Sequence, residues 1–298
     1  MIYDEISRNK RDSFFLILFF SVFVVLAGYF IGEAWMKGGG PLGIAIGFGI
    51  SLIMSLVSFY SGDKVILASV GAQKASRDSH PQLINIVEEL TIASGLPLPE
   101  IYVVPDASPN AFAAGRDPQH SIVAVNEGLL RMLNREELQG VIAHELSHIQ
   151  NRDILYATIV AVLLGMVVIL STIFRNSWMF GGSRRRDDRD SSGGMIILIG
   201  ILFAILAPIA AKLIQLAISR KREYLADSSA ALMTRNPSGL ASALQKLYNS
   251  NIPSQRVNEA IAPLYIAPLK GKNLQILFST HPPISDRIKR LTQMAYKV

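Results

Sequence analysis

The stretch LQGVIAHELSHIQNRD, residues 138–153, decides the fold, because it carries His144, Glu145 and His148 in an HExxH arrangement. Residues four apart lie about one turn from each other on a helix, so both imidazoles project from the same face and can bind one zinc ion. Glu145 sits beside them and can take the proton of an attacking water without binding the metal itself. The pattern predicts hydrolysis of peptide bonds without a covalent intermediate.

Neither chance nor a solvated helix face explains this motif. Five histidines and eleven glutamates among 298 residues give about 0.003 HExxH matches by chance. The side chains that surround the motif are apolar: Val141, Ile142, Leu146 and Ile149. Two imidazoles and a carboxylate in such surroundings are costly unless a metal ion satisfies them, which favours a zinc site.

A catalytic zinc ion needs a third protein ligand, and the HExxH helix does not supply it. The remaining histidines, which form no short HExxHxxGxxH pattern, are His80, His120 and His281. In the strongly helical segment 219–233, Glu223 and Asp227 are four residues apart. Glu223 can complete a His2Glu ligand set, and Asp227 can accept the free ring N–H of a ligating histidine. The alternative is that both acids pair with the basic residues 220–222 on a solvated face.

The composition is that of a membrane protein. Half of the residues are hydrophobic and only 17% are charged, against about 25% in an ordinary soluble domain. Four runs of 17 to 25 residues contain no Asp, Glu, Lys, Arg or His: 13–32, 38–62, 154–174 and 195–211. Because about 20 apolar residues span a bilayer, we expect four transmembrane helices, and a soluble cytosolic enzyme is excluded.

These runs divide the chain into alternating membrane and soluble parts. We expect an N-terminal transmembrane hairpin at 1–62, the first part of a cytoplasmic catalytic domain at 63–153, a hydrophobic hairpin at 154–211, and the second part of the catalytic domain at 212–298. The first catalytic part holds the HExxH helix, and the second holds the Glu223 helix. The hydrophobic hairpin includes a loop rich in Arg, Asp, Gly and Ser at 175–194.

The soluble part between residues 63 and 153 combines helix and strand patterns. Helical spacing and turn residues predict helices at 81–94 and 126–133, and a third helix that opens with a capping box of Asn134 and Glu137. The short strands are expected at 101–104, 111–114 and 121–125. The fold class is therefore mainly α, with a small β-sheet beside the HExxH helix.

Small residues predict close contact between the first two membrane helices. Gly28 and Gly32 are four apart in the first span, and Gly43 and Gly47 are four apart in the second. Such spacing lets two membrane helices approach closely, although glycines can also fall together by chance in lipid-facing spans.

The absence of cysteine and the distribution of charge limit the possible metal ligands and binding partners. The chain has no cysteine, so it has no disulfide framework and no thiolate ligand, and a metal must be held by histidines and carboxylates. The net charge is +6, but the basic residues flank the hydrophobic runs, as cytoplasmic membrane flanks do, so no nucleic-acid partner is expected. The loop 175–194 is an exception to this distribution of basic residues. It holds five arginines and would lie on the external side of the membrane if both flanking runs cross it. A membrane-embedded hairpin would equally bring the two ligand helices to one side.

The motifs HELSHIQNRD, SRKREYLAD, PNAFAAG and FSTHPP with a following arginine resemble those of the HtpX-type membrane zinc endopeptidases, which are relatives of the CAAX prenyl-protein proteases. The resemblance covers essentially the whole chain. It implies a gluzincin-like α+β catalytic domain that faces the cytoplasm from a prokaryotic plasma membrane. It further implies one zinc ion per chain with Glu223 as the third ligand, protein or peptide substrates, and a role in membrane-protein quality control and the stress response.

The same resemblance gives roles to two further motifs. It places Asn110, Ala111, Phe112 and Ala113 on an edge strand above the zinc ion, where an extended substrate pairs with the backbone. The alternative is an ordinary buried strand with small residues for packing. It also places His281 and Arg287 near the active site, with His281 as a hydrogen-bond donor to the developing oxyanion. His281 equally fits the start of a helix, because prolines follow it.

Other functions stay open at this level. A CAAX-type processing protease is disfavoured because that group usually has more spans than the four visible here. A catalytically silent membrane scaffold is disfavoured because the base and all three candidate ligands are retained. A His2Glu set also suits Co or Mn. The sequence carries no signal for an oligomeric state.

Overall fold

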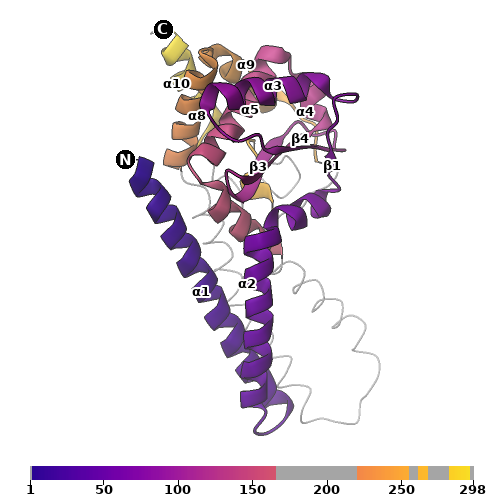
Figure 1. Cartoon of the computed structure of the whole chain (residues 1–298), viewed down its shortest axis with the longest axis vertical. Coiled ribbons are helices and arrows are strands. Elements are labelled where there is room, and N and C mark those ends of the chain that lie inside the picture. Colours follow the sequence, from indigo (N-terminus) through magenta and orange to yellow (C-terminus); the bar gives the residue numbers. More distant parts are fainter. Residues whose placement is uncertain (1, 166–219, 255–260, 268–281, 296–298) are drawn as a thin grey trace.

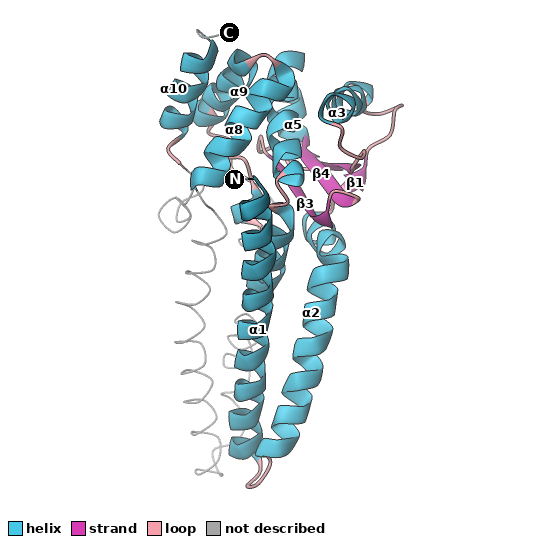
Figure 2. Ribbon diagram, turned by 60° about the vertical axis from the view of Figure 1, so that its left-hand side comes forward, coloured by secondary structure: helices cyan, strands magenta, loops and turns pink. Residues whose placement is uncertain are grey.

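The computed structural model describes residues 2–165, 220–254, 261–267 and 282–295. Two long helices, α1 (Ile2–Trp35) and α2 (Gly40–Val70), lie side by side and project from a head that contains the sheet and the other helices (Figures 1 and 2). The two long helices meet at the loop farthest from the head and diverge toward it (Figure 1). The described chain thus has two parts of different shape, a stalk and a head.

The head is built on one four-stranded sheet. Its strands, in chain order, are β1 (Gln73–Lys74), β2 (Glu100–Val104), β3 (Ala111–Asp117) and β4 (His120–Asn126). The spatial order is β1-β2-β4-β3, with β2 parallel to β4 and β3 antiparallel to β4. The three predicted strands are confirmed, and β3 forms one edge of the sheet.

The head contains the helices predicted at 81–94 and 126–133 and the helix predicted to open at Asn134, together with further helices. In chain order the helices of the head are α3 (Pro81–Ser94), α4 (Glu127–Met132), α5 (Arg135–Gln150), α8 (Arg220–Thr234), α9 (Pro237–Asn249), the short 3-10 helix η1 (Ala262–Leu264) and α10 (Ile284–Ala295). The predicted capping box opens α5, because Asn134 Oδ1 accepts from the N–H of Glu137 and Glu137 Oε2 accepts from the N–H of Asn134, each at 2.9 Å. Gly95 ends α3 in the left-handed conformation, with φ 70°.

The two faces of the sheet contact different parts of the molecule. Ala111 and Ala113 of β3 belong to the core that packs against α3 and α5. Phe112 and Ala114, on the opposite face, pack against the last turns of α2 and against the helix Ile154–Gly165. The sheet therefore connects the HExxH helix on one side with the upper ends of the apolar helices on the other.

The glycines predicted to bring α1 and α2 together do so. A methyl group on Gly28 would lie 2.3 Å from the carbonyl oxygen of Gly43, and one on Gly32 would lie 2.5 Å from that of Gly39. Any larger side chain at these positions would force the helices apart.

Two of the four expected spans are present in the described residues. The segments Arg11–Glu33 and Gly40–Val70 are long and apolar enough to cross a membrane. The helix Ile154–Gly165 is the beginning of the third run and packs between α1 and α2 at the head. The rest of that run, the loop 175–194 and the run 195–211 lie outside the described residues.

Candidate metal centre

Helices α5 and α8 pack against each other so that three potential metal ligands meet. His144 Nε2 lies 3.2 Å from His148 Nε2, and each of these atoms lies 3.7 Å from an oxygen of Glu223. One ligand atom from each of the three residues falls within 4.8 Å of the others. The structure therefore brings together all three ligands expected from the sequence, although they lie 79 positions apart along the chain.

The arrangement fits a metal ion by distance. Ligand atoms about 2.0–2.1 Å from a tetrahedral zinc ion lie about 3.3 Å from one another. The two Nε2 atoms lie 3.2 Å apart, close to this value, and each lies 3.7 Å from a different oxygen of Glu223.

The hydrogen bonds of the two rings give a second test. His144 Nδ1 lies 3.1 Å from Asp227 Oδ1, and His148 Nδ1 lies 3.2 Å from Asp153 Oδ2. A neutral imidazole that donates through Nδ1 presents a lone pair on Nε2. With both rings in this form, two lone pairs would face each other at 3.2 Å beside the Glu223 carboxylate, an arrangement that a bound cation would stabilise.

Asp153 is a functional candidate that the sequence analysis missed. Arg152, two residues after the end of α5, has a positive φ of 57°, and the chain turns back so that the N–H of Asp153 bonds to the carbonyl of His148 at 3.0 Å. This turn brings the Asp153 carboxylate to the ring of His148. The only hint in the sequence is an acid five residues after the second histidine, at the end of HELSHIQNRD.

Arg287 is a fully buried residue next to the candidate ligands. Its side chain is 0% exposed and donates to both oxygens of Asp227, at 2.7 and 2.9 Å, and to the carbonyl of Ile266 at 3.1 Å. One of its nitrogens also lies 3.4 Å from His144 Nδ1. Arg287 is thus close to the site, as the resemblance implied, and it touches the carboxylate that contacts His144. His281 lies outside the described residues.

Burial makes Glu145 a group that can exchange a proton near neutrality. The residue is 1% exposed. Burial raises the pKa of its carboxyl to about 7, against the opposing influence of His148. The carboxylate of Glu223 raises this pKa further, while Arg287 and a hydrogen bond from the backbone of Ala113 lower it. A general base is most effective when its pKa is close to the operating pH.

The surrounding charges act on the other groups in opposite directions. Burial favours neutral His148, but the carboxylates of Asp153, Glu223 and Glu145 outweigh burial and raise the pKa of His148 to about 9. Burial lowers the pKa of His144. Burial alone would raise the pKa of Asp227, but Arg287 and His144 hold it below its usual range. The excess of carboxylates around the two rings is a further feature of a site for a cation.

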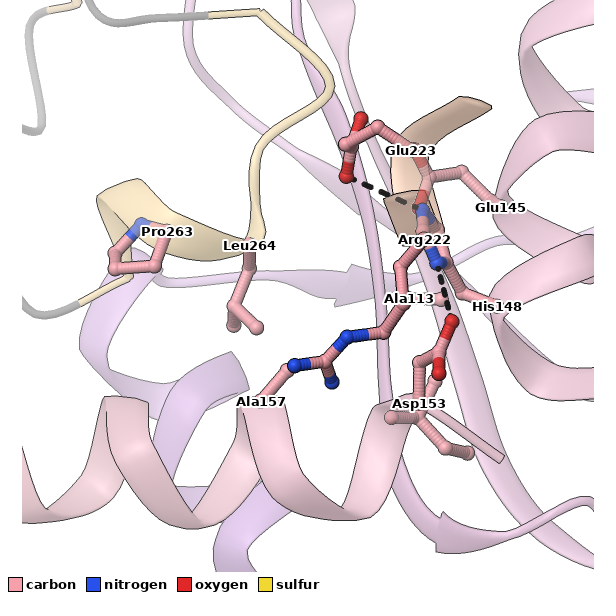
Figure 3. Close-up of a pocket in the computed structure, with 10 residues that line it drawn as sticks. Ala113, Glu145, His148, Asp153, Ala157, Arg222, Glu223, Pro263 and Leu264 are labelled. Carbon is pink, nitrogen blue, oxygen red and sulfur yellow. Dashed lines mark hydrogen bonds and ion pairs between the residues drawn. The ribbon is translucent and has the colours of Figure 1, made fainter. Parts of the chain in front are cut away.

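A cavity of about 40 Å³ opens beside Glu145 and His148 (Figure 3). Of the predicted substrate strand, Ala113 lines this cavity. The side chain of Asn110 instead donates to the carbonyl of Ala267 at 3.0 Å, and the carbonyl of Ala111 accepts from the N–H of Ile266 at 3.2 Å. Phe112 packs edge-on against Tyr265. The chain's own segment Ile261–Ala267 therefore lies against the first half of the β3 edge.

Two histidines from one helix, a glutamate from a second helix and an adjacent buried glutamate form the arrangement of a metal-dependent hydrolase. The family model of Peptidase family M48 matches residues 77–295. The chain therefore belongs to peptidase family M48 and is a metallopeptidase.

Relatives along the full chain confirm the resemblance to HtpX-type proteases. The Protease HtpX homolog of Caldanaerobacter subterraneus subsp. tengcongensis is 44% identical over 295 residues, which cover 98% of each chain. The Protease HtpX homolog of Streptococcus gordonii is 44% identical over 299 residues, covering 99% of this chain and all of the relative. Among solved structures, the crystal structure of S. mikatae Ste24p has a TM-score of 0.49 at 18% identity and covers 81% of this chain and 56% of that chain.

Proposed function

We propose that this protein is a zinc-dependent endopeptidase of the prokaryotic plasma membrane, which hydrolyses peptide bonds of damaged or misfolded membrane proteins at the cytoplasmic face. The observation that carries the proposal is the meeting of His144, His148 and Glu223 beside the buried base Glu145. The relatives named Protease HtpX homolog support the peptidase activity.

In this proposal His144, His148 and Glu223 hold one zinc ion. Two imidazoles and one carboxylate are a ligand set of catalytic zinc sites and leave a further position open. Asp227 and Asp153 accept hydrogen bonds from the two rings and fix the nitrogen that faces the metal. When bound, the ion supplies a Lewis acid for the scissile carbonyl and lowers the pKa of water.

Glu145 performs the proton transfers. Its carboxylate takes a proton from the attacking water and delivers it to the amine that leaves when the peptide bond breaks. The backbone of Ala113 holds this carboxylate by a hydrogen bond, so the base is positioned before substrate binds. The substrate pairs its backbone with the β3 edge next to Ala113, which gives affinity without strong side-chain selection.

The proposed membrane topology has four spans, with the head on the cytoplasmic side. The exposed apolar surface of α1 and α2 supports the first two spans. The helix Ile154–Gly165 starts directly after Asp153, which supports a site next to the membrane surface. The proposed second hairpin consists of the apolar runs 154–174 and 195–211 of the sequence. The basic flanks of the spans favour a cytoplasmic head.

The topology can be tested with single cysteines because the chain contains none. In sealed cells, a membrane-impermeant thiol reagent should label Ser183→Cys, in the loop 175–194, from outside. The exposed Ser79→Cys in the head should react only after the cells are opened. Labelling of Ser183→Cys from the cytoplasmic side alone would replace the second pair of spans with a re-entrant hairpin.

Activity is tested with full-length protein purified in detergent. We expect about one zinc ion per chain and metal-dependent hydrolysis of casein, which Glu145→Gln abolishes. A scaffold would bind the metal and cleave nothing. A CAAX-type processing protease would leave casein intact and remove the last three residues of a peptide in which a prenylated cysteine is fourth from the C-terminus. A comparison of membrane proteins that accumulate with Glu145→Gln should then identify the substrates.

A further inference from the structure

Another cavity, of about 310 Å³, lies where the head meets the stalk. Its lining comes from the head end of α2, the residues leading into β2, the β3–β4 hairpin and the helix Ile154–Gly165. The end of α2 reaches β3 at this point (Figures 1 and 2). None of the lining residues belongs to the cavity beside Glu145. The volume is in the range of small-molecule pockets, about 300–1,000 Å³.

The position of this cavity along α2 corresponds to a membrane surface. α2 begins at Gly40, at the end of the stalk farthest from the head, and Tyr60 follows 20 residues later. At about 1.5 Å per residue this stretch is about 30 Å long, which is the thickness of the hydrocarbon core of a bilayer. Residues 38–62 contain no charged side chain, and Asp63 and Lys64 directly follow them. A bilayer around the stalk therefore has its phospholipid headgroups at the level of the cavity.

Aromatic and cationic side chains meet at this level. Phe59 and Tyr60 are 37% and 58% exposed, and aromatic residues are typical of the membrane–water interface. The guanidinium carbon of Arg116 lies 5.3 Å from the centre of the Tyr60 ring. Arg116 contacts Asp117 through Nε, at 3.5 Å, so its two terminal nitrogens can bind a phosphate in the bidentate manner typical of arginine. Lys64 follows Tyr60 by about one helical turn and adds a second cation near this ring.

Three other ionisable residues line the cavity, and two of them are already paired. Glu100 accepts a hydrogen bond from the hydroxyl of Tyr102 at 2.8 Å, and His120 Nδ1 lies 2.8 Å from Asp117 Oδ1. The third, Asp63, is half-buried, and its carboxylate makes no hydrogen bond or ion pair with the residues that the structure describes. The cavity therefore combines two cations with a carboxylate that can accept a positive group.

The cavity is held open by contacts between three elements. The N–H of Gly115 in β3 donates to Oγ1 of Thr158 at 3.0 Å. A methyl group on Gly62 of α2 would lie 2.7 Å from Cγ2 of the same threonine, so α2 packs directly on the helix Ile154–Gly165. Thr158 is 2% exposed. The lining residues are thus in place before a ligand binds, which lowers the cost of binding.

We propose that this cavity binds the headgroup of one phosphatidylethanolamine molecule. Arg116 and Lys64 bind its phosphate, Asp63 binds its ammonium group, and its acyl chains lie along the exposed apolar side chains of α2. An anionic headgroup without an ammonium group would leave Asp63 unpaired beside the phosphate. The proposal rests on the proposed placement of α1 and α2 in a bilayer and is independent of the peptidase activity. The bound lipid joins β3 to α2 and so holds the head against the membrane surface.

The test is a titration of full-length protein in detergent with phosphatidylethanolamine or phosphatidylglycerol, with bound lipid counted by native mass spectrometry. Both lipids carry the same phosphate, but only the first has an ammonium group. Hydrogen bonds to charged groups contribute about 1.5–3 kcal/mol, which corresponds to roughly 10-fold or more in affinity. The parent should therefore bind one phosphatidylethanolamine at least about 10-fold more tightly than phosphatidylglycerol. Equal affinities, or tighter binding of phosphatidylglycerol, would overturn the proposal.

Substitutions should separate the two halves of the headgroup. Arg116→Gln and Lys64→Gln each remove a contact to the phosphate, so both lipids should bind at least about 10-fold more weakly. Asp63→Asn should weaken phosphatidylethanolamine alone and thus remove the preference. Two controls should keep the parent's affinities: Arg135→Gln, at an exposed ion pair of the head, and Lys37→Gln, at the opposite end of the stalk.

Lys64 is exposed, so its exchange decides the matter if Arg116→Gln does not fold. A folded Lys64→Gln or Asp63→Asn protein with the parent's affinities for both lipids would overturn the site. Glycerophosphoethanolamine has the same headgroup without acyl chains and should bind much more weakly than the lipid. Equal affinity for this soluble compound would overturn a lipid as the occupant.

Failure of this proposal can be distinguished from failure of the proposed function. Glu145→Gln should bind phosphatidylethanolamine as the parent does, because the two cavities share no lining residue. Casein hydrolysis and lipid binding are therefore measured independently. If the placement of the stalk in a bilayer is wrong, the parent is released from membranes by alkaline extraction, whatever its affinity for either lipid.

Discussion

The stalk and the head distribute polar and apolar side chains in opposite ways. On α1 and α2, Phe14 and Ile53 are each 63% exposed, and only a small share of either helix is buried. In the head, His144 is 1% and Arg287 0% exposed. A folded chain exposes large apolar surfaces where its surroundings are apolar, and it buries charged groups where they are paired or bind a cation. The comparison supports the proposal that lipid surrounds the stalk and that the functional centre lies inside the head.

The two regions meet at the boundary between residues 153 and 154. Asp153 bonds to His148, and Ile154 begins the apolar helix that packs between α1 and α2. One turn of chain therefore contributes both to the orientation of a candidate ligand and to the attachment of the head to the stalk. Changes on either side of this boundary should have distinct effects, and the predictions below separate them.

The largest effect is expected from Glu145→Gln in the head. The variant keeps the ligands but lacks the base, so hydrolysis of casein should fall by about 10² to 10⁴ while zinc content stays the same. Glu136→Gln changes an exposed residue of the same helix and should retain the parent's activity. Near-normal turnover by zinc-loaded Glu145→Gln would remove this residue from the mechanism.

Glu223→Ala should produce the largest loss of metal. Two imidazoles from one helix supply half of a tetrahedral shell, and water does not replace the charge of the carboxylate. Titration against a chelator of known zinc affinity should show weaker binding than in any variant of Asp153 or Asp227. If Glu223→Ala binds zinc as tightly as the parent, the third ligand is another residue.

Two exposed isoleucines, one in each region, can test whether lipid or water surrounds that region. Ile53 in α2 and Ile92 in α3 are 63% and 84% exposed, respectively. Ile53→Lys should cost about 3 kcal/mol of membrane insertion, whereas Ile92→Lys should change stability by no more than about 0.5 kcal/mol. The measurements are the fraction of each variant that resists alkaline extraction from membranes and its melting temperature in detergent. Equal behaviour of the two variants would contradict a lipid environment around α2.

Local patterns allowed the sequence to predict α3, α5 and the strands β2, β3 and β4, because caps, turn residues and periodicity act over a few positions. The glycine contact between Gly28 and Gly43 was also predictable from spacing alone. The docking of Ile266 on Ala111 was not, since it depends on contacts about 155 positions apart along the chain. For the same reason, the sequence suggested that Arg287 is near the site but not that it pairs with Asp227.

The smallest effects should come from the two carboxylates that orient the rings. Loss of such a group typically costs about 10- to 100-fold in metal affinity or activity, because the histidine remains a ligand but loses its acceptor. Asp227→Asn should lie at the upper end of this range, since it also removes the charge that pairs with buried Arg287. Asp153→Asn should lie at the lower end.

The surface pair of Asp117 and His120, with 2.8 Å between Oδ1 and Nδ1, supplies the matched control. Asp117→Asn breaks the same kind of contact away from the ligands and should leave zinc affinity unchanged. An Asp153→Asn protein that binds zinc as the parent does would show that the turn at Arg152 serves the boundary with the apolar helix alone. Asp153 would then contribute to the attachment of the head to the stalk rather than to the metal centre.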